Sequence, residues 1–503
     1  MEILQELVHI LTMNKTKKIR QYGFLQDETG RLLAFYEGLA KDKWNTDEEA
    51  AQDLLGLDAK HKTYRRLKNN LREELLDALL FIENKGNNDF QVVFYDSYKK
   101  WAQLAFLRHQ QAKNTALVLA KKILKKAIEY DMTVLILEVA RWLKGTNAAH
   151  LGIEKEYQYY SDLVKEYLTV FHLEIEVEGL FYDINIGYVK SKAKNINLFK
   201  TFYKDYNKMK VHYGKVNSFF YHFYTSLIGI TLFMSKDDFF ETKSICSDTV
   251  EYFETKGVRY KGSIHIFLYQ SIVCDIQLKD FSSAKKSVEK CYTLTKKGTH
   301  YHFRTLENHL ILSCYTKEYD QAYDLLQTAK KTKGFKFLLP TVKERWILHE
   351  AYVQFLVEVG KAKGNPAQDK KFKLQKFLNE IPTFTQDKRG MNIPVLLLQV
   401  LFLWSRKDFD HAYQRIENLK KYNSRYLNEE DTMRTTYFIK MLSVAATEGF
   451  APRATKKATA SLYQEMTSRE IVFANQSAEL EYIPYEELWA IGMEILEERL
   501  VSD

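Results

Sequence analysis

Proline is absent from the first two thirds of this 503-residue chain, and all six prolines lie at position 340 or later. Proline interrupts helix interiors because it lacks a backbone donor and clashes with the preceding turn. A long proline-free stretch that is rich in leucine, lysine, glutamate and alanine therefore permits consecutive helices. An AT-rich genome also depletes proline, and the abundance of lysine, tyrosine, isoleucine and asparagine fits such a genome. That composition suggests a bacterial source.

Cysteine is also scarce, and no two cysteines form a C-x-x-C pair. The four residues are Cys246, Cys274, Cys291 and Cys314. All fall in expected helices, so we predict reduced thiols in the core, as in a cytosolic protein. Two cysteines and three histidines gather within 24 residues, at Cys291, His300, His302, His309 and Cys314. This spacing matches no usual Cys₂His₂ frame, and we therefore predict no metal and no cofactor.

Several functional signatures are missing as well. No run of about 18 apolar residues occurs, and the first 20 residues lack the basic, apolar and small-residue regions of a signal peptide. We therefore expect a cytoplasmic location and no membrane contact. Phosphate-binding loops, dinucleotide fingerprints, nucleophile elbows and H-E-x-x-H zinc helices do not occur. These absences favour a protein that is not an enzyme, with a divergent nuclease as the enzymatic alternative.

Charge is distributed unevenly along the chain. The net charge is +9, yet residues 461–503 carry ten acidic and two basic side chains, a net of −8, which leaves +17 for the remainder. A basic body with an acidic tail predicts either a contact between the two or an anionic partner for the body. A solubilising terminal helix is the simpler alternative.

Apolar residues recur with the period of a helix along nearly the whole chain. In the stretch 62–82 they lie three or four residues apart, at Tyr64, Leu67, Leu71, Leu75, Ala78 and Ile82. This spacing marks one face of a helix. Alternating stretches such as 174–178 sit inside longer helical patterns. We therefore predict an all-α chain, with helices of about 12–20 residues after residue 90.

Residues 1–90 are predicted to form a separate helical unit, with helices at 2–13, 31–42, 47–55 and 62–82. Thr46 and Glu49 form a capping box, in which each side chain satisfies a backbone donor near the other residue. Gly56 then ends the short helix as its C′ residue. A capped helix, a glycine-containing turn and a second helix resemble a helix-turn-helix in their order.

The second of these helices carries the candidate nucleic-acid-binding residues Lys60, Lys62, Arg65, Arg66, Lys68, Asn69 and Arg72. Arg and Lys neutralise phosphates, and Arg and Asn hydrogen-bond to base edges. The alternative is a solvated basic face. Tyr64 fits the core better than a base-stacking role, because it belongs to the apolar row. Two further basic stretches, at 121–126 and 361–376, are more simply explained as solvated faces.

A six-residue pattern recurs in the second half of the chain. K-D-F-S-S-A at 279–284 matches K-E-Y-D-Q-A at 317–322 and K-D-F-D-H-A at 407–412, with a weaker copy at 237–242. The aromatic residues recur after 42 and 38 residues and then after 90. The last gap fits two units with a degenerate turn near 360–365. Each copy joins a hydrophobic segment to an amphipathic one.

These residues resemble the tetratricopeptide repeat (TPR). In that family the aromatic residue fills the gap between helices and the alanine permits close approach. The resemblance therefore implies packing roles for Phe281, Ala284, Tyr319, Ala322, Phe409 and Ala412. Departures are the missing terminal proline and periods longer than the family's usual ~34 residues. The resemblance implies a right-handed α-α superhelix, a TPR-like solenoid, whose stacked hairpins leave a concave surface.

Four domains follow from these patterns. They are a basic N-terminal unit (1–90), divergent helical hairpins (91–220), TPR-like repeats (221–440) and acidic C-terminal capping helices (441–503). We predict a regulator or adaptor that binds a protein or peptide on its superhelix and contacts DNA or RNA through the basic helix. This order is similar to regulators that couple a helix-turn-helix head to a repeat sensor. A pure protein scaffold without nucleic-acid contact is the main alternative.

Overall fold

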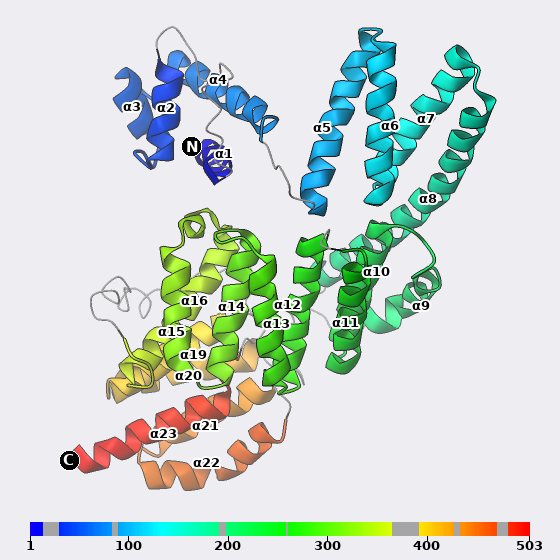
Figure 1. Ribbon diagram of the computed structural model, residues 1–503. Coiled ribbons are helices and arrows are strands. Elements are labelled where there is room, and N and C mark those ends of the chain that lie inside the picture. The colour runs from blue at the N-terminus through cyan, green and yellow to red at the C-terminus, as the bar shows by residue number, and fades with distance from the viewer. Residues whose placement is uncertain are drawn as a thin grey trace. The chain divides into compact units, whose positions relative to one another are not determined.

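The computed structural model describes residues 1–13, 30–82, 89–190, 198–257, 260–364, 392–426, 433–469 and 481–502. Nearly all of these residues are helical, and no strand occurs among them, which confirms the prediction of an all-α chain. The chain forms two compact units, Met1–Tyr130 and Asp131–Asp503, coloured blue to cyan and cyan to red in Figure 1. Within the described ranges, no helix combines the length and the apolar character that a membrane span requires.

The first unit contains six helices in its described part. They are α1 (Glu2–Met13), α2 (Arg31–Ala40), α3 (Asp47–Leu55), α4 (Lys62–Leu79), α5 (Phe90–His109) and α6 (Lys113–Glu129). α1 has the predicted bounds, whereas α2 and α4 end two and three residues earlier than predicted. The predicted domain boundary at residue 90 falls at the start of α5, inside this unit.

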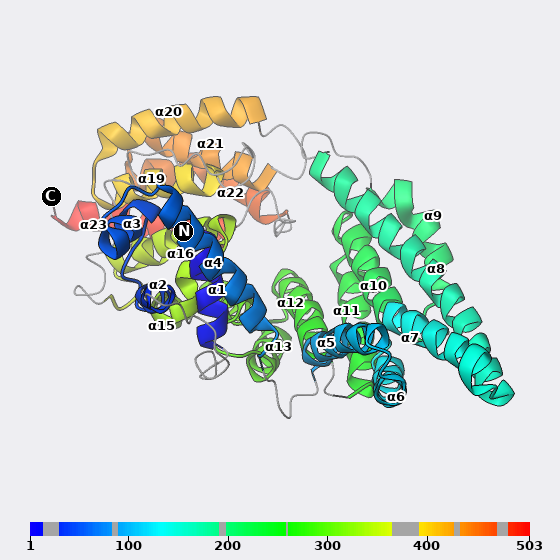
Figure 2. The same ribbon diagram turned by 90° about the horizontal axis from the view of Figure 1, so that it is seen from above.

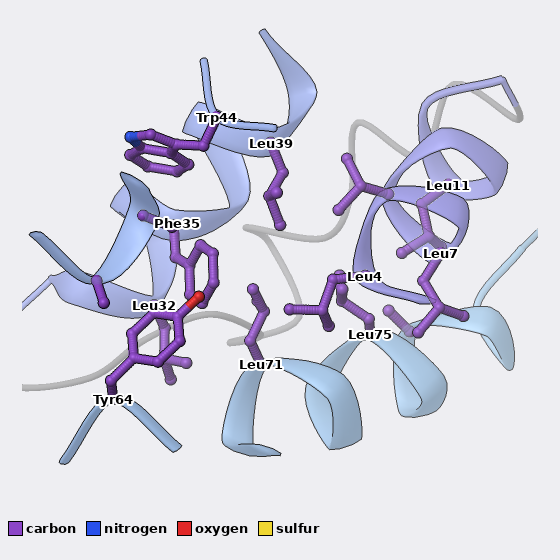
Figure 3. Close-up of a cluster of buried hydrophobic side chains, with 14 residues drawn as sticks. Leu4, Leu7, Leu11, Leu32, Phe35, Leu39, Trp44, Tyr64, Leu71 and Leu75 are labelled. Carbon is purple, nitrogen blue, oxygen red and sulfur yellow. The ribbon is translucent and has the colours of Figure 1, made fainter. Parts of the chain in front are cut away.

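A shared hydrophobic core holds α1 to α4 together, and Figure 3 shows its side chains converging. Leu4, Leu7 and Leu11 of α1 meet Leu71 and Leu75 of α4 in this core. Aromatic rings fill its other end, with the Phe35 ring 5.9 Å from Trp44 and 5.8 Å from Tyr64. Tyr64 is 1% exposed, so it lies in the core as predicted.

The capping box forms with one change of partner. Thr46 Oγ1 accepts a hydrogen bond from the Glu49 amide at 3.2 Å. The Glu49 carboxylate in turn accepts from the amide of Asn45, one residue before the predicted partner. Gly56 closes α3 at a φ of 65°, a conformation that favours glycine. The cap explains why α3 begins where the sequence predicts.

The second unit begins with α7 (Thr133–Thr146) and α8 (Glu154–Lys190), which run side by side in Figures 1 and 2. α8 has 37 residues, so the predicted upper length of about 20 is wrong for this helix. No proline interrupts it, and its internal Gly179 is exposed and costs only about 1 kcal/mol relative to alanine. The alternating stretch Glu174–Glu178 lies inside α8, as predicted.

Helical hairpins follow α8 and α9 (Leu198–Lys210). Their first helices are α10 (Phe219–Met234), α12 (Lys261–Gln277), α14 (His300–Tyr315), α16 (Pro340–Glu358), α19 (Asn392–Ser405) and α21 (Met433–Thr447). The second helices are α11 (Phe239–Thr255), α13 (Phe281–Leu294), α15 (Tyr319–Lys331), α20 (Phe409–Tyr426) and α22 (Pro452–Thr467). The described chain ends in α23 (Tyr485–Ser502). Consecutive helices pack against one another through this series.

One turn design joins the helices of four hairpins. Asp237, Lys279, Lys317 and Lys407 each adopt a φ of 58–60°. The amide of the next residue then donates to the carbonyl five residues earlier, as Asp280 does to Asp275 at 2.8 Å, which closes the first helix. The Asp280 carboxylate also accepts from the Ser283 amide and so caps the second helix. The recurrent lysine-acid-aromatic sequence therefore encodes a turn that ends one helix and starts another.

The residues of the six-residue pattern occupy equivalent places. Phe281, Tyr319 and Phe409 are the first residues of α13, α15 and α20. Ala284, Ala322 and Ala412 follow one turn later with no exposed surface. The turn expected near 360–365 is present, because Gly360 has a φ of 71° and the Lys361 amide donates to the Leu356 carbonyl.

Candidate interaction surfaces

Six of the seven predicted nucleic-acid-binding residues are exposed, and the seventh, Lys68, is bound to an acidic residue. The exposed residues are Lys60, Lys62, Arg65, Arg66, Asn69 and Arg72. Lys68 differs, because its ammonium donates to Asp47 at 2.8 Å and its side chain is only 32% exposed. We therefore assign Lys68 to the packing of α4 on α3 and leave it out of the candidate surface.

Lys60 precedes α4, and the other five residues line one side of this helix. Lys62, Arg65, Asn69 and Arg72 follow one another at steps of three and four, which places them on one helix face, and Arg66 lies beside them. Arg72 contacts Glu73 at 2.9 Å, but both side chains are exposed and water screens such pairs. We call these five residues the α4 basic stripe.

Asp47 fixes the orientation of α4, and sequence reasoning missed it. Its carboxylate accepts from the Tyr64 hydroxyl at 2.8 Å, from Lys68 at 2.8 Å and from the Met1 amine at 3.0 Å. Burial works against the charged form, but these donors prevail and lower the pKa of Asp47 to about 2. The acid-rich start of α3 suggested only a helix cap, and nothing in the sequence paired Asp47 with residues 17 and 21 positions later.

In the other basic stretches, some of the described lysines contact acids of their own chain. Lys121, Lys122, Lys125 and Lys126 lie exposed on α6, and Lys126 contacts Glu129 at 2.8 Å. Lys361 contacts Glu494 at 2.5 Å and Lys363 contacts Asp320 at 3.6 Å. Lys370, Lys371, Lys373 and Lys376 lie outside the described residues.

The cysteines and histidines form no metal centre in the described part of the chain, where no group of three potential ligands gathers. All four cysteines are buried, and burial raises the pKa of Cys291 and Cys314 to about 12. Such thiols stay protonated and are poor metal ligands and nucleophiles at neutral pH. Their positions fit packing between helices.

Two buried histidines make the second unit sensitive to acid. His222 and His265 are at most 2% exposed, and burial lowers the pKa of each to about 4. The unfolded chain binds these protons below about pH 6.5 and the folded chain does not, so stability is complete above pH 6.5 and falls as the pH drops towards 4. Between pH 7.5 and 5.5 we expect the pair to cost about 3 kcal/mol of unfolding free energy.

Urea unfolding at these two pH values measures the effect. The His222→Asn/His265→Asn variant should lose about 3 kcal/mol of this pH dependence. The remainder comes in part from His300, His302, His309 and His349, whose pKa values burial also lowers. An unfolding free energy of the wild type that stays constant from pH 7.5 to 5.5 would contradict the assignment.

The first helices of successive hairpins form a second candidate surface, which we call the first-helix face. Direct contacts join its members. The His265 ring on α12 hydrogen-bonds to Thr305 of α14 at 2.8 Å, and the Phe355 ring on α16 lies 5.6 Å from Phe402 of α19. Helices some 40 positions apart in sequence therefore pack side by side beneath this face.

A polar cluster crosses α12, α14 and α16 on the first-helix face. Arg345 donates from Nε to the Glu307 carboxylate at 2.8 Å, and the His349 ring lies 3.3 Å from the same oxygen. Burial alone would raise the pKa of Glu307, but the His349 hydrogen bond and the Arg345 charge lower it. Glu307 is thereby held ionised in the core and anchors α16 to α14.

Arg304 supplies a cationic group beside this cluster. Its guanidinium donates to the Tyr269 hydroxyl at 3.1 Å and lies 5.2 Å from the ring centroid. Within the described ranges no carboxylate lies at ion-pair distance from Arg304, which is half-buried, and His300 one turn earlier is exposed. Arg304, His300 and Tyr269 together make a site with the chemistry to receive an anionic group.

The C-terminal segment Glu481–Ser502 packs on the same face. The Tyr482 ring lies 4.6 Å from His349 and 5.0 Å from Tyr352 of α16. Tyr485 stacks on Phe438 of α21 at 4.6 Å. Further along, α23 lies against α21 and α22, as Figure 1 shows in red. Six apolar residues of the segment are at most 2% exposed: Tyr482, Ile483, Tyr485, Leu488, Ile491 and Leu496.

Charges hold this segment in place. Arg434 of α21 donates to Glu481 at 2.7 and 3.1 Å and to Glu486 at 2.5 Å. Lys317, in the turn after α14, forms an ion pair with Glu487, and Lys361 pairs with Glu494. The uneven charge of the sequence therefore reflects, at least in these pairs, a contact between basic body and acidic tail.

The comparisons with known proteins name no relative. No protein-family model matches the chain, and no curated protein and no solved structure matches it. The resemblance to the tetratricopeptide repeat therefore remains a prediction.

Proposed function

We propose that this chain is a non-enzymatic helical-repeat interaction protein that binds an acidic, aromatic peptide segment on its first-helix face. In this proposal the hairpins from α10 to α22 form a divergent TPR-like right-handed superhelix. The recurrent turn at Lys279, Lys317 and Lys407 supports a repeat, because the same turn and the same buried alanine return in each unit.

One observation carries the choice of ligand. The first-helix face holds a segment of its own chain, Glu481–Ser502, through aromatic stacking and arginine or lysine contacts to glutamates. A surface that accepts such a segment within the chain has the chemistry to accept a similar one from another protein. Arg304, beside Tyr269 and His300, offers a further cationic position on that face.

A synthetic peptide that copies residues 481–494 is the direct probe. Fluorescence anisotropy with the full-length protein should give saturable binding in the micromolar range. A charge-assisted hydrogen bond contributes about 1.5–3 kcal/mol, so Arg304→Ala should weaken binding by about 10- to 100-fold.

Two controls keep this test specific. Arg406→Ala removes an exposed arginine that pairs with Glu358 away from the cluster, and it should leave the dissociation constant unchanged. The second control is a peptide with its glutamates replaced by glutamine. Its affinity for the wild type should be as low as the affinity of the original peptide for Arg304→Ala. Equal affinity of both peptides for the wild type, or equal affinity of wild type and Arg304→Ala, would rule the site out.

Nucleic-acid binding by the first unit is the second candidate function. The α4 basic stripe presents Lys62, Arg65 and Arg72 on one exposed face with Asn69 between them. Arginine and lysine contact phosphates, and asparagine can read adenine in the major groove. If the stripe is only solvated, the protein is a scaffold that works through its first-helix face alone.

A further inference from the structure

The long helix α8 carries an apolar stripe that no other described helix of the second unit covers. One side of α8 packs on α7 and α10. The stripe lies on another side and follows steps of three and four residues over six turns. Its members are Val164, Leu168, Phe171, Ile175, Gly179, Tyr182 and Ile186.

Four side chains of this stripe have similar exposures. Leu168, Ile175, Tyr182 and Ile186 are 53%, 51%, 49% and 52% exposed. Single exposed apolar residues are common on soluble proteins, but a continuous row of them along about 33 Å of one helix indicates an interface. The steps of three and four are those by which one helix packs against another.

We propose that a second copy of this chain binds here, with the two α8 helices antiparallel about a two-fold axis at Ile175. The same patch then faces itself, as a two-fold interface requires. Ile175 meets its copy, Leu168 lies opposite Tyr182, and Val164 lies opposite Ile186. Each exposed side chain of the stripe thereby gains an apolar partner.

Shape supports this register. Phe171, the bulkiest half-buried member, lies opposite Gly179 of the other copy. Nothing lies within 4 Å of the position that a Cβ would take at Gly179, so the space above it is open. A large ring thus meets the one place on the stripe that has no side chain, which lets the helices approach closely.

Charge supports the same orientation. The antiparallel register places Lys165 near Asp183 of the other copy and His172 near Glu176. All four side chains are exposed. Among the described residues, Lys165 contacts Asp162 at 3.5 Å and His172 contacts Glu176 at 3.3 Å, and these exposed pairs can exchange partners. In a parallel two-fold pair these four residues would lie on opposite sides of the two helices, so these ion pairs could not form.

The size of the contact predicts its strength. Six side chains and one glycine per copy, with four of the side chains about half exposed, would bury roughly 1,000 Å² in total, which lies at the low end of specific interfaces. We therefore expect a dimer that forms at micromolar concentration and not an obligate one. The two surfaces of the proposed function take no part in it, so this inference stands without them.

Sedimentation velocity of the full chain from 1 to 100 µM tests the proposal. The wild type should shift from monomer to dimer over this range. Ile175→Glu places two like charges at the axis and should leave a monomer throughout. Tyr159→Glu changes a residue of equal exposure, about 160° around the same helix, and should dimerise like the wild type.

Reversing the charges of one predicted ion pair provides a second test of the dimer, and this test does not depend on any one variant folding well. Lys165→Glu and Asp183→Lys should each weaken the dimer several-fold, and the double variant should restore it. A wild type that remains monomeric at 100 µM, an Ile175→Glu chain that dimerises like the wild type, or a double variant weaker than both singles would overturn the proposal.

Discussion

Replacing Arg434 by alanine is expected to lower the unfolding free energy of the second unit by about 3–5 kcal/mol. Arg434 is 4% exposed and uses every donor of its guanidinium. Nε and Nη2 donate to Glu481, Nη2 also donates to Glu486, and Nη1 donates to the carbonyls of Met466 and Arg469. Without Arg434 the Glu481 carboxylate stays buried without its countercharge, and two carbonyls lose a donor.

Arg406→Ala provides the matched control for this prediction. Arg406 also binds one carboxylate through two nitrogens, at Glu358, but its side chain is 45% exposed. Exposed pairs contribute about 1 kcal/mol or less. Urea unfolding followed by circular dichroism measures both variants. A loss at Arg434 no larger than that at Arg406 would mean that the C-terminal segment is not anchored as described.

Binding of duplex DNA by the α4 basic stripe is expected to weaken by about 100-fold between 50 and 200 mM salt, if some four phosphates are contacted. Each neutralised phosphate contributes about −0.9 to the slope of log affinity against log salt. Lys62→Ala/Arg65→Ala/Arg66→Ala should therefore reduce the slope by about 3. The variant keeps Tyr64, Lys68 and Asp47, which hold α4 in place.

The control for the stripe is a second triple variant in the same unit. Lys121→Ala/Lys122→Ala/Lys125→Ala removes the same charge from α6, outside the stripe. Electrophoretic mobility shift assays over the salt range should give a reduced slope for the α4 variant only. Equal slopes for both variants would show a diffuse charge effect, and no binding at 50 mM salt would leave the scaffold function.

The sequence predicts local structure well because local contacts determine it. Thr46 and Gly56 bound α3 through hydrogen bonds to residues a few positions away. The lysine-acid-aromatic turn at 279–281 also needs only neighbouring backbone and one side-chain cap. A single sequence is enough to recognise such signals, because both partners lie within a few residues of each other.

The candidate sites depend on pairs of residues that lie far apart in the sequence, and the sequence alone could not predict these pairs. The contact of Glu307 with Arg345, or of Arg434 with Glu481, joins residues 38 and 47 positions apart, and no local pattern selects these partners. Lys68 looked equivalent to Arg65 in the sequence, and only the position of Asp47 distinguishes them. Charge asymmetry allowed a contact between the acidic tail and the basic body, but it equally allowed an anionic partner or a solubilising terminal helix, and it did not select the residues that pair.

Hydrogen exchange measured by mass spectrometry, with and without the peptide of residues 481–494, tests the first-helix face most directly. The account predicts added protection in α12, α14 and α16, around Tyr269, Arg304 and Arg345, and none in α4 or α8. Protection should disappear in Arg304→Ala at the same peptide concentration. Saturating peptide that protects other helices, or protects none, would contradict the claim that this face binds an acidic partner segment.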